Sequence, residues 1–158
     1  MVKSFQIGKI EAKLLSSLQR DASASVAEMA EATNASPATV WRRIRALEDR
    51  GVIGPPVRLV DPAQVGRGMD VYCQVRMKSQ DAAARAAFQR AVDAEPSILE
   101  VYSVTGEWDY MLHMVVRDIA DFEAILMRRL LELECVASTS TIFALRRIKH
   151  TREVPVEG

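Results

Sequence analysis

The feature that most constrains the fold is a change of hydrophobic period between the two halves of the chain. Over residues 7–50 the apolar side chains recur at helical spacing, as at Ile10, Leu14 and Leu18. From about residue 70, strand-like alternation and helical spacing take turns. The 158 residues therefore predict an α+β protein with a small helical unit ahead of a mixed unit.

Three short helices are expected in the first unit, because capping signals mark the start of two of them. Ser25 and Glu28 form a capping box ahead of the second helix. Ser36 is placed to cap the third helix, and Pro37 takes its first position, where a missing N–H costs nothing. We expect that helix to run to Arg50. Such a pair of helices joined by a tight turn is typical of a helix-turn-helix, whose second helix enters the major groove of DNA.

The third helix has an apolar side and a basic side. Its apolar side consists of Val40, Ile44 and Leu47. Trp41, at the edge of that side, is interpreted as a packing residue. Arginine binds phosphate or donates two hydrogen bonds to guanine, and small residues allow close approach to a duplex. The predicted DNA-contacting residues are Ser36, Ala38, Thr39, Arg42, Arg43 and Arg45. On pattern alone, a solvated helical bundle with an arginine-rich face explains this helix equally well.

A breaker-rich linker, residues 54–69, connects the units, and residues 57–60 within it are expected to form a short strand. The pattern beyond it predicts the order strand, helix, strand, strand, helix, strand, over residues 70–78, 81–95, 98–105, 110–116, 119–134 and 136–148. This βαββαβ order is the ferredoxin-like arrangement, with two helices on one face of an antiparallel sheet. Apolar residues lie on both sides of the strands, so we expect a second copy to cover the other face in a homodimer.

Several classes of protein are disfavoured by what the sequence lacks. Cys73 and Cys135 lie far apart and outside any CxxC motif, and with His113 and His150 they offer no metal-ligand spacing. We therefore expect no metal and no cofactor. His113 is interpreted as a packed or interface histidine. No 18-residue apolar run or signal-peptide core is visible, so no membrane span and a cytoplasmic location are expected. The net charge is zero, so DNA binding would depend on a local basic face.

The segment between the middle two strands is a candidate ligand site. It reads Thr105, Gly106, Glu107, Trp108, Asp109. Glycine admits turn conformations closed to other residues, and turn N–H groups can bind a carboxylate. The Asp109 carboxylate is suited to an ammonium group, so the turn would fit the zwitterion of an α-amino acid. From spacing alone, a plain β-hairpin turn is the stronger interpretation.

Two stretches of the chain resemble the Lrp/AsnC family of bacterial and archaeal regulators. Residues 35–53, ASPATVWRRIRALEDRGVI, are similar to that family's recognition helix and its exit. Residues 104–112, VTGEWDYML, look like its V-T/S-G-x-x-D-Y-L-L signature. The resemblance covers residues 7–150. It implies a sequence-specific, double-stranded-DNA-binding transcriptional regulator with an amino-acid effector, acting as a homodimer that assembles further, often to an octamer.

The domain boundaries come from the pattern, and the effector contacts come from the resemblance. The breaker-rich linker and the change of pattern set the boundaries: a helix-turn-helix domain over residues 1–53, a linker over 54–69, a ferredoxin-like domain over 70–150 and a C-terminal tail over 151–158, and the resemblance assigns effector binding and oligomerisation to the third of these. The implied effector-binding residues are Thr105, Gly106, Glu107, Trp108 and Asp109, with Thr139 and Thr141 on the final strand.

Two alternatives share this layout. One is an enzyme that resembles the siroheme decarboxylases, and the other is a metabolite-binding protein with a vestigial DNA-binding domain. The sequence has no nucleophile–base pattern, no glycine-rich phosphate loop and no metal cluster. We therefore expect a regulator rather than an enzyme.

Overall fold

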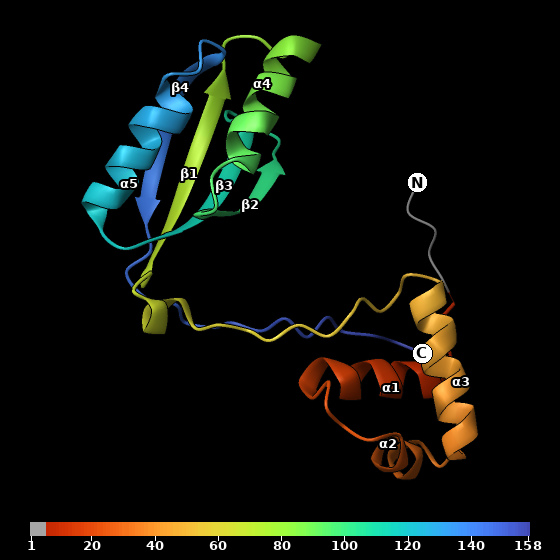
Figure 1. Cartoon of the computed structure of the whole chain (residues 1–158). Coiled ribbons are helices and arrows are strands. Elements are labelled where there is room, and N and C mark those ends of the chain that lie inside the picture. The colour runs from red at the N-terminus through yellow and green to blue at the C-terminus, as the bar shows by residue number, and fades with distance from the viewer. Residues whose placement is uncertain (1–5) are drawn as a thin grey trace. The chain divides into compact units, whose positions relative to one another are not determined.

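The computed structural model describes residues 6–158, which form two compact units (Figure 1). One unit combines the residues up to Arg58 with the C-terminal residues Lys149–Gly158. The other unit is Leu59–Ile148. The helical unit is therefore built from both ends of the chain.

Three helices make up most of the helical unit: α1 (Lys9–Arg20), α2 (Val26–Thr33) and α3 (Pro37–Asp49). Each helix turns its apolar side to a shared core, which removes that surface from water. The buried residues of this core are Leu14, Met29, Ala30 and Val40. Leu47 of α3 is also fully buried. The predicted order of three short helices is confirmed.

The helix starts follow the capping signals in the sequence. The Glu28 amide donates to Ser25 Oγ at 3.2 Å, and the Ser25 amide donates to the Glu28 carboxylate at 2.7 Å. These bonds hold the pKa of Glu28 below its ordinary value. At the start of α3, Ser36 Oγ accepts from the Thr39 amide at 3.2 Å. Asn34 ends α2 with φ of 53°, a left-handed conformation that asparagine tolerates, so the chain turns sharply into α3.

The last residues of the chain are bonded to α1. The Gln19 side chain exchanges two hydrogen bonds with the backbone of Val154, at 3.0 and 2.6 Å. Glu153 accepts from Ser16 and from Arg20, each at 3.0 Å, and these bonds lower its pKa. The sequence suggested a separate tail over residues 151–158, whereas this segment forms part of the helical unit.

The second unit has the order β1 (Met69–Met77), α4 (Ala82–Asp93), β2 (Ile98–Ser103), β3 (Tyr110–Val116), α5 (Ile119–Ile125) and β4 (Val136–Phe143). A π-helical turn over Leu126–Leu131 continues α5, and a 3₁₀ turn over Pro62–Val65 precedes β1. The strands form one antiparallel sheet in the order β2-β3-β1-β4. This confirms the predicted βαββαβ arrangement.

Both helices of this unit cover the same face of the sheet (Figure 1). Phe88 of α4 and Leu130 after α5 pack there against buried strand residues such as Val75 and Leu112. Tyr72, Tyr102 and Ile142 lie on the opposite face, which we call the open face, and are 37%, 54% and 51% exposed. The sheet therefore has one face covered by helices and one that exposes large apolar side chains.

His113 lies on the open face, within a network of polar contacts. Its ring stacks on Tyr72 at 4.9 Å between centroids, and its Nε2 is 2.8 Å from Asp70 Oδ1. Arg147 also donates to both Asp70 oxygens, at 2.8 and 2.9 Å. Burial acts to raise the pKa of Asp70, but the bonds from His113 and Arg147 outweigh it and lower that pKa. The side chain of His113 is packed, in agreement with the sequence interpretation.

Two strand predictions differ from the structure. Residues 57–60 form no strand, and Val57, Leu59 and Val60 are exposed. An extended segment needs a partner for its backbone groups, and Pro55 and Pro56 before it lack the N–H that a ladder requires. The final strand ends at Phe143 rather than at residue 148, because the last bond, from Ala144 N to Asp70 O, reaches the beginning of β1.

Candidate nucleic-acid interface and effector site

Burial of one side of α3 leaves the opposite side on the surface. Val40 and Leu47 are fully buried, and Ile44 is half-buried beside them. Of the predicted DNA-contacting residues, the exposed ones are Ser36, Ala38, Arg42 and Arg45, and the half-buried ones are Thr39 and Arg43. The Thr39 hydroxyl lies 2.9 Å from that of Ser36. Most of the predicted set therefore shares the outer side of the helix.

The three predicted arginines differ in their partners. Arg45 pairs with Glu48 at 3.2 Å and with Asp49 at 3.9 Å, both within its own helix. Arg42 makes no hydrogen bond or ion pair within residues 6–158. Exposed pairs such as those of Arg45 contribute little stability and are readily exchanged. Arg42 is therefore the arginine of this set best placed to bind an anion without first losing a partner.

Arg43 points toward α1 rather than away from the helical unit. Its Nη1 lies 3.4 Å from Glu11 Oε1, and its Nε is buried without a hydrogen-bond partner. The pair connects α3 to α1. This contact gives Arg43 a role in holding the two helices together, and its contact with DNA stays a prediction.

Trp41 corrects the sequence interpretation. A packing role was expected, but the side chain is 62% exposed. The core side of α3 is already occupied by Val40, Ile44 and Leu47, and Trp41 lies past the edge of that side. The helical period alone could not decide this, because the position borders both faces.

The turn between β2 and β3 closes the hairpin at the edge of the sheet. The Val104 amide donates to Asp109 O, and the Asp109 amide donates to Val75 O of β1, both at 3.0 Å. Gly106 has φ of 115°, a conformation that other residues rarely adopt. The turn is thus fixed to β1 as well as to its own strands.

Arg76 lies on β1 and contacts this turn, which the sequence analysis did not suggest. It donates from Nε to Glu107 O at 3.2 Å, and its Nη2 also pairs with the Glu107 carboxylate. Its guanidinium carbon lies 5.1 Å from the centroid of the Trp108 ring. The contacts span 31 positions, so only the sheet register could bring them together. The turn thus carries a cation, an anion and an indole in mutual contact.

Both carboxylate oxygens of Asp109 have donors. The Met77 amide donates to Oδ2 at 2.7 Å, and the Gln80 side-chain amide donates to Oδ1. These bonds connect the turn to the end of β1 and to the segment ahead of α4. Asp109 therefore positions the turn in the structure, and its contact with an effector ammonium stays a prediction.

The predicted residues of the final strand lie on the far side of β1 from the turn. In the register, Thr139 opposes Val75 and Thr141 opposes Cys73. Since neighbouring strands lie about 4.8 Å apart, β1 separates these threonines from the turn by roughly two strand spacings. Ser138 opposes Arg76, the residue bonded to the turn. The structure thus brings together the turn residues 105–109 but does not place Thr139 and Thr141 in contact with them.

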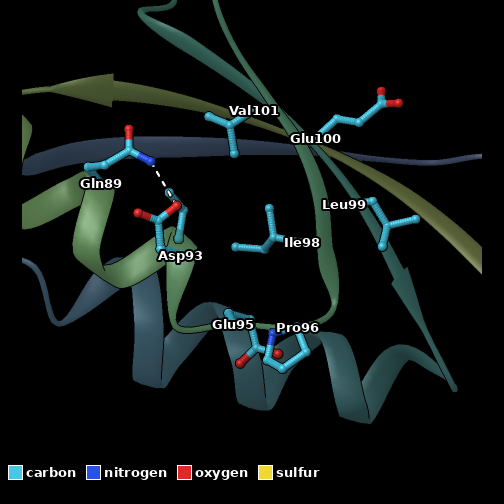
Figure 2. A pocket seen from close by; sticks show the side chains of 9 residues that line it. Gln89, Asp93, Glu95, Pro96, Ile98, Leu99, Glu100 and Val101 are labelled. Carbon is cyan, nitrogen blue, oxygen red and sulfur yellow. Dashed lines mark hydrogen bonds between the residues drawn. The ribbon is translucent and has the colours of Figure 1, made fainter. Parts of the chain in front are cut away.

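A cavity of about 380 Å³ lies elsewhere in the α/β unit, between the end of α4 and β2 (Figure 2). Its acidic side chains have partners: Gln89 donates to Asp93 at 2.8 Å, and Arg129 lies 3.5 Å from Glu95. None of the predicted site residues lines it. The cavity is therefore separate from the candidate effector turn.

The structure also addresses the sequence predictions on metal-ligating side chains and on the lengths of the helices. Within residues 6–158, no group of three or more His, Cys, Asp or Glu side chains could hold a metal ion. Burial raises the pKa of the Cys73 thiol to about 11, so it is protonated near neutrality. In the same part of the chain, no helix has the length and hydropathy of a membrane span.

Known families match both units. The family of winged helix-turn-helix DNA-binding domains matches residues 9–53, and the family of Lrp/AsnC ligand binding domains matches residues 70–154. These matches define a class of protein in which a DNA-binding helical unit accompanies a ligand-binding unit. The chain belongs to the Lrp/AsnC family of transcriptional regulators. This agrees with the resemblance found in the sequence and favours a regulator over a decarboxylase-like enzyme.

Individual relatives support the same assignment along the whole chain. The glutamate uptake regulatory protein of Zymomonas mobilis is 32% identical over 96% of this chain and 92% of its own. An AsnC family transcriptional regulator of Agrobacterium tumefaciens has a TM-score of 0.88 and 34% identity, covering 94% of this chain and 96% of that one. A transcriptional regulator of Neisseria meningitidis, solved with L-methionine, has a TM-score of 0.90 and 29% identity, covering 95% and 97%.

Proposed function

We propose that this regulator binds duplex DNA through the outer side of α3. The observation that carries the proposal is that Arg42 and Arg45 are exposed on a capped helix whose other side is buried. Arginine on a recognition helix binds phosphate or the O6 and N7 atoms of guanine. Ser36, Ala38 and Thr39 at the start of the helix allow its N-terminal N–H groups to approach phosphate. Arg43 completes the predicted set from the side that faces α1.

A homodimer would join two such helices. The exposed apolar residues of the open face, Tyr72, Tyr102 and Ile142, favour a second copy as the covering partner, because isolated sheets rarely leave such a surface in water. Two recognition helices would then contact half-sites about one turn of DNA apart, or a multiple of it. Further assembly, to an octamer, is part of this proposal, as is action in the cytoplasm.

An amino acid is the proposed effector, with the turn at Thr105–Asp109 as its binding segment. Names of relatives support this class, since one regulates glutamate uptake and another was solved with L-methionine. Turn N–H groups suit the carboxylate of the ligand. Thr139 and Thr141, which β1 separates from the turn of the same chain, would contribute only if ligand binding involved more than one chain. The effector acts by binding one assembly or DNA-affinity state more tightly than another.

The DNA-binding proposal is tested with a duplex that the protein selects from a random-sequence pool. Arg42→Ala should weaken binding to that duplex by about 1–3 kcal/mol if Arg42 reads a base. If Arg42 contacts phosphate, the variant should lose affinity equally for all DNA sequences. The slope of log affinity against log salt concentration should then fall by about one.

The matched control is Arg90→Ala, because Arg90 is an exposed arginine on α4 of the other unit. This variant should bind the selected duplex as the wild type does. Equal binding by Arg42→Ala and the wild type would remove Arg42 from the interface, and failure to select any duplex would contradict the proposed function.

A further inference from the structure

Trp41 is an exposed aromatic side chain on the helix that carries the proposed DNA contacts. It is 62% exposed, although tryptophan has the largest apolar surface of any side chain and is highly buried on average. Within residues 6–158, its indole makes no ring-stacking or cation–π contact. The helical unit therefore displays an indole that does not serve its own core.

The position of Trp41 places it among the proposed DNA contacts. Residues three and four apart are neighbours on a helix surface, so Ala38 and Arg45 flank Trp41. It is the fifth residue of α3, which begins at Pro37, and the N-terminal half of a recognition helix is the part that contacts base edges. Ala38 has only a methyl group, so it leaves space beside the indole.

Arg45 does not compete with the indole for that space. Its guanidinium pairs with Glu48 and Asp49, which lie toward the C-terminal end of the helix. The side chain of Trp41 is therefore the large group presented by the first half of α3, together with the unpaired Arg42.

We propose that Trp41 is a specificity-determining residue that contacts the C5-methyl group of a thymine in the major groove. This inference rests on the proposed placement of α3 on DNA. The thymine methyl is the apolar group that base edges present in the major groove, and an apolar side chain is its natural partner. The next residue, Arg42, is exposed and unpaired and attracts a polyanion, which favours a nucleic-acid duplex over an apolar protein surface.

The test removes the methyl group and the indole separately. Each thymine of the selected duplex is replaced in turn by uracil, which lacks only the C5-methyl group. The wild type should lose several-fold in affinity at one position of each half-site. Trp41→Ala should bind the unmodified duplex several-fold more weakly and show no further loss at that position, because coupled contacts are not additive. Leu99→Ala, which truncates a 52% exposed apolar residue of the other unit, is the control and should respond to uracil like the wild type.

A second variant separates contact from folding. Trp41→Phe keeps an apolar ring and should retain most of the uracil response. It leaves Trp108 as the remaining tryptophan, so an emission change on adding the duplex should occur in the wild type and be absent in this variant. Trp41→Ala should also melt close to the wild-type temperature, because little of this side chain is buried.

Three results would overturn the inference. The first is that uracil at no position changes the affinity of the wild type. The second is that Trp41→Ala loses as much affinity on uracil replacement as the wild type does. The third is a large fall in the melting temperature of Trp41→Ala, which would indicate that the indole packs in the unit. Loss of the Arg42 effect as well would contradict the proposed function, whereas a normal Arg42 effect with no Trp41 effect would contradict this inference alone.

Discussion

The bond between Gln19 and Val154 predicts that the C-terminal residues stabilise the DNA-binding unit. Gln19 uses both ends of its side-chain amide on the backbone of Val154, at 3.0 and 2.6 Å. A hydrogen bond contributes a net of about 0.5–1.5 kcal/mol, and exposed bonds lie at the lower end. Loss of both bonds in Gln19→Ala should therefore cost about 1–2 kcal/mol. Truncation after Arg152 should cost at least as much, since it also removes the contacts of Glu153.

The expected change is large enough to measure because the helical unit is small. For a unit of about 70 residues, a loss of 1 kcal/mol lowers the melting temperature by roughly 7 °C. Calorimetry should show this fall in the transition of the helical unit and not in that of the α/β unit. Hydrogen exchange should become faster in peptides from α1, because its outer side loses a restraint.

Gln89→Ala is the matched control. Gln89 is an exposed glutamine whose side chain bonds only within its own helix, to Asp93. It should leave the exchange of α1 unchanged. If Gln19→Ala and the truncated chain exchange and melt like the wild type, then the C-terminal segment does not restrain α1 and the reasoning is refuted.

Two further predictions concern the α/β unit. The Arg117 side chain and amide hold the pKa of Asp121 at about 2, below its ordinary 3.8, so the stabilisation they provide is present above about pH 4 and is lost as pH falls toward 2. Asp121→Asn should make the fall in melting temperature between pH 4 and 2 shallower, and an unchanged acid profile would contradict this. Asp109→Ala releases the bonds to Met77 and Gln80 and should abolish the rise in melting temperature that an effector amino acid gives the wild type. The molar mass of its assembly in solution should equal that of the wild type. A normal ligand response would remove Asp109 from the site.

Local signals in the sequence predicted the helices well. The capping box at Ser25 and Glu28, the Ser36-Pro37 start and the apolar spacing of α3 each depend on residues within one or two turns. Interactions at that range can be read from the chain directly. The βαββαβ order was likewise predictable, because strand alternation and helical spacing are local patterns.

Contacts that depend on register or on distant segments were not predictable. Arg76 meets Glu107 across 31 positions, and Gln19 meets Val154 across 135. No local pattern marks such pairs. The packing prediction for Trp41 was wrong for a different reason. Whether a residue at the border of two helix faces is buried depends on the size of the core and not on the helical period.

The position of residues 149–158 within the helical unit has a topological consequence. The α/β unit is inserted into the DNA-binding unit, so the two are joined by two covalent connections, near Arg58 and near Lys149. A single tether lets a domain rotate about one hinge, whereas two tethers restrict rotation and couple strain in the inserted unit to both ends of the host. A ligand that shifted either the start of β1 or the end of β4 would then transmit that shift to the DNA-binding unit through both backbone connections.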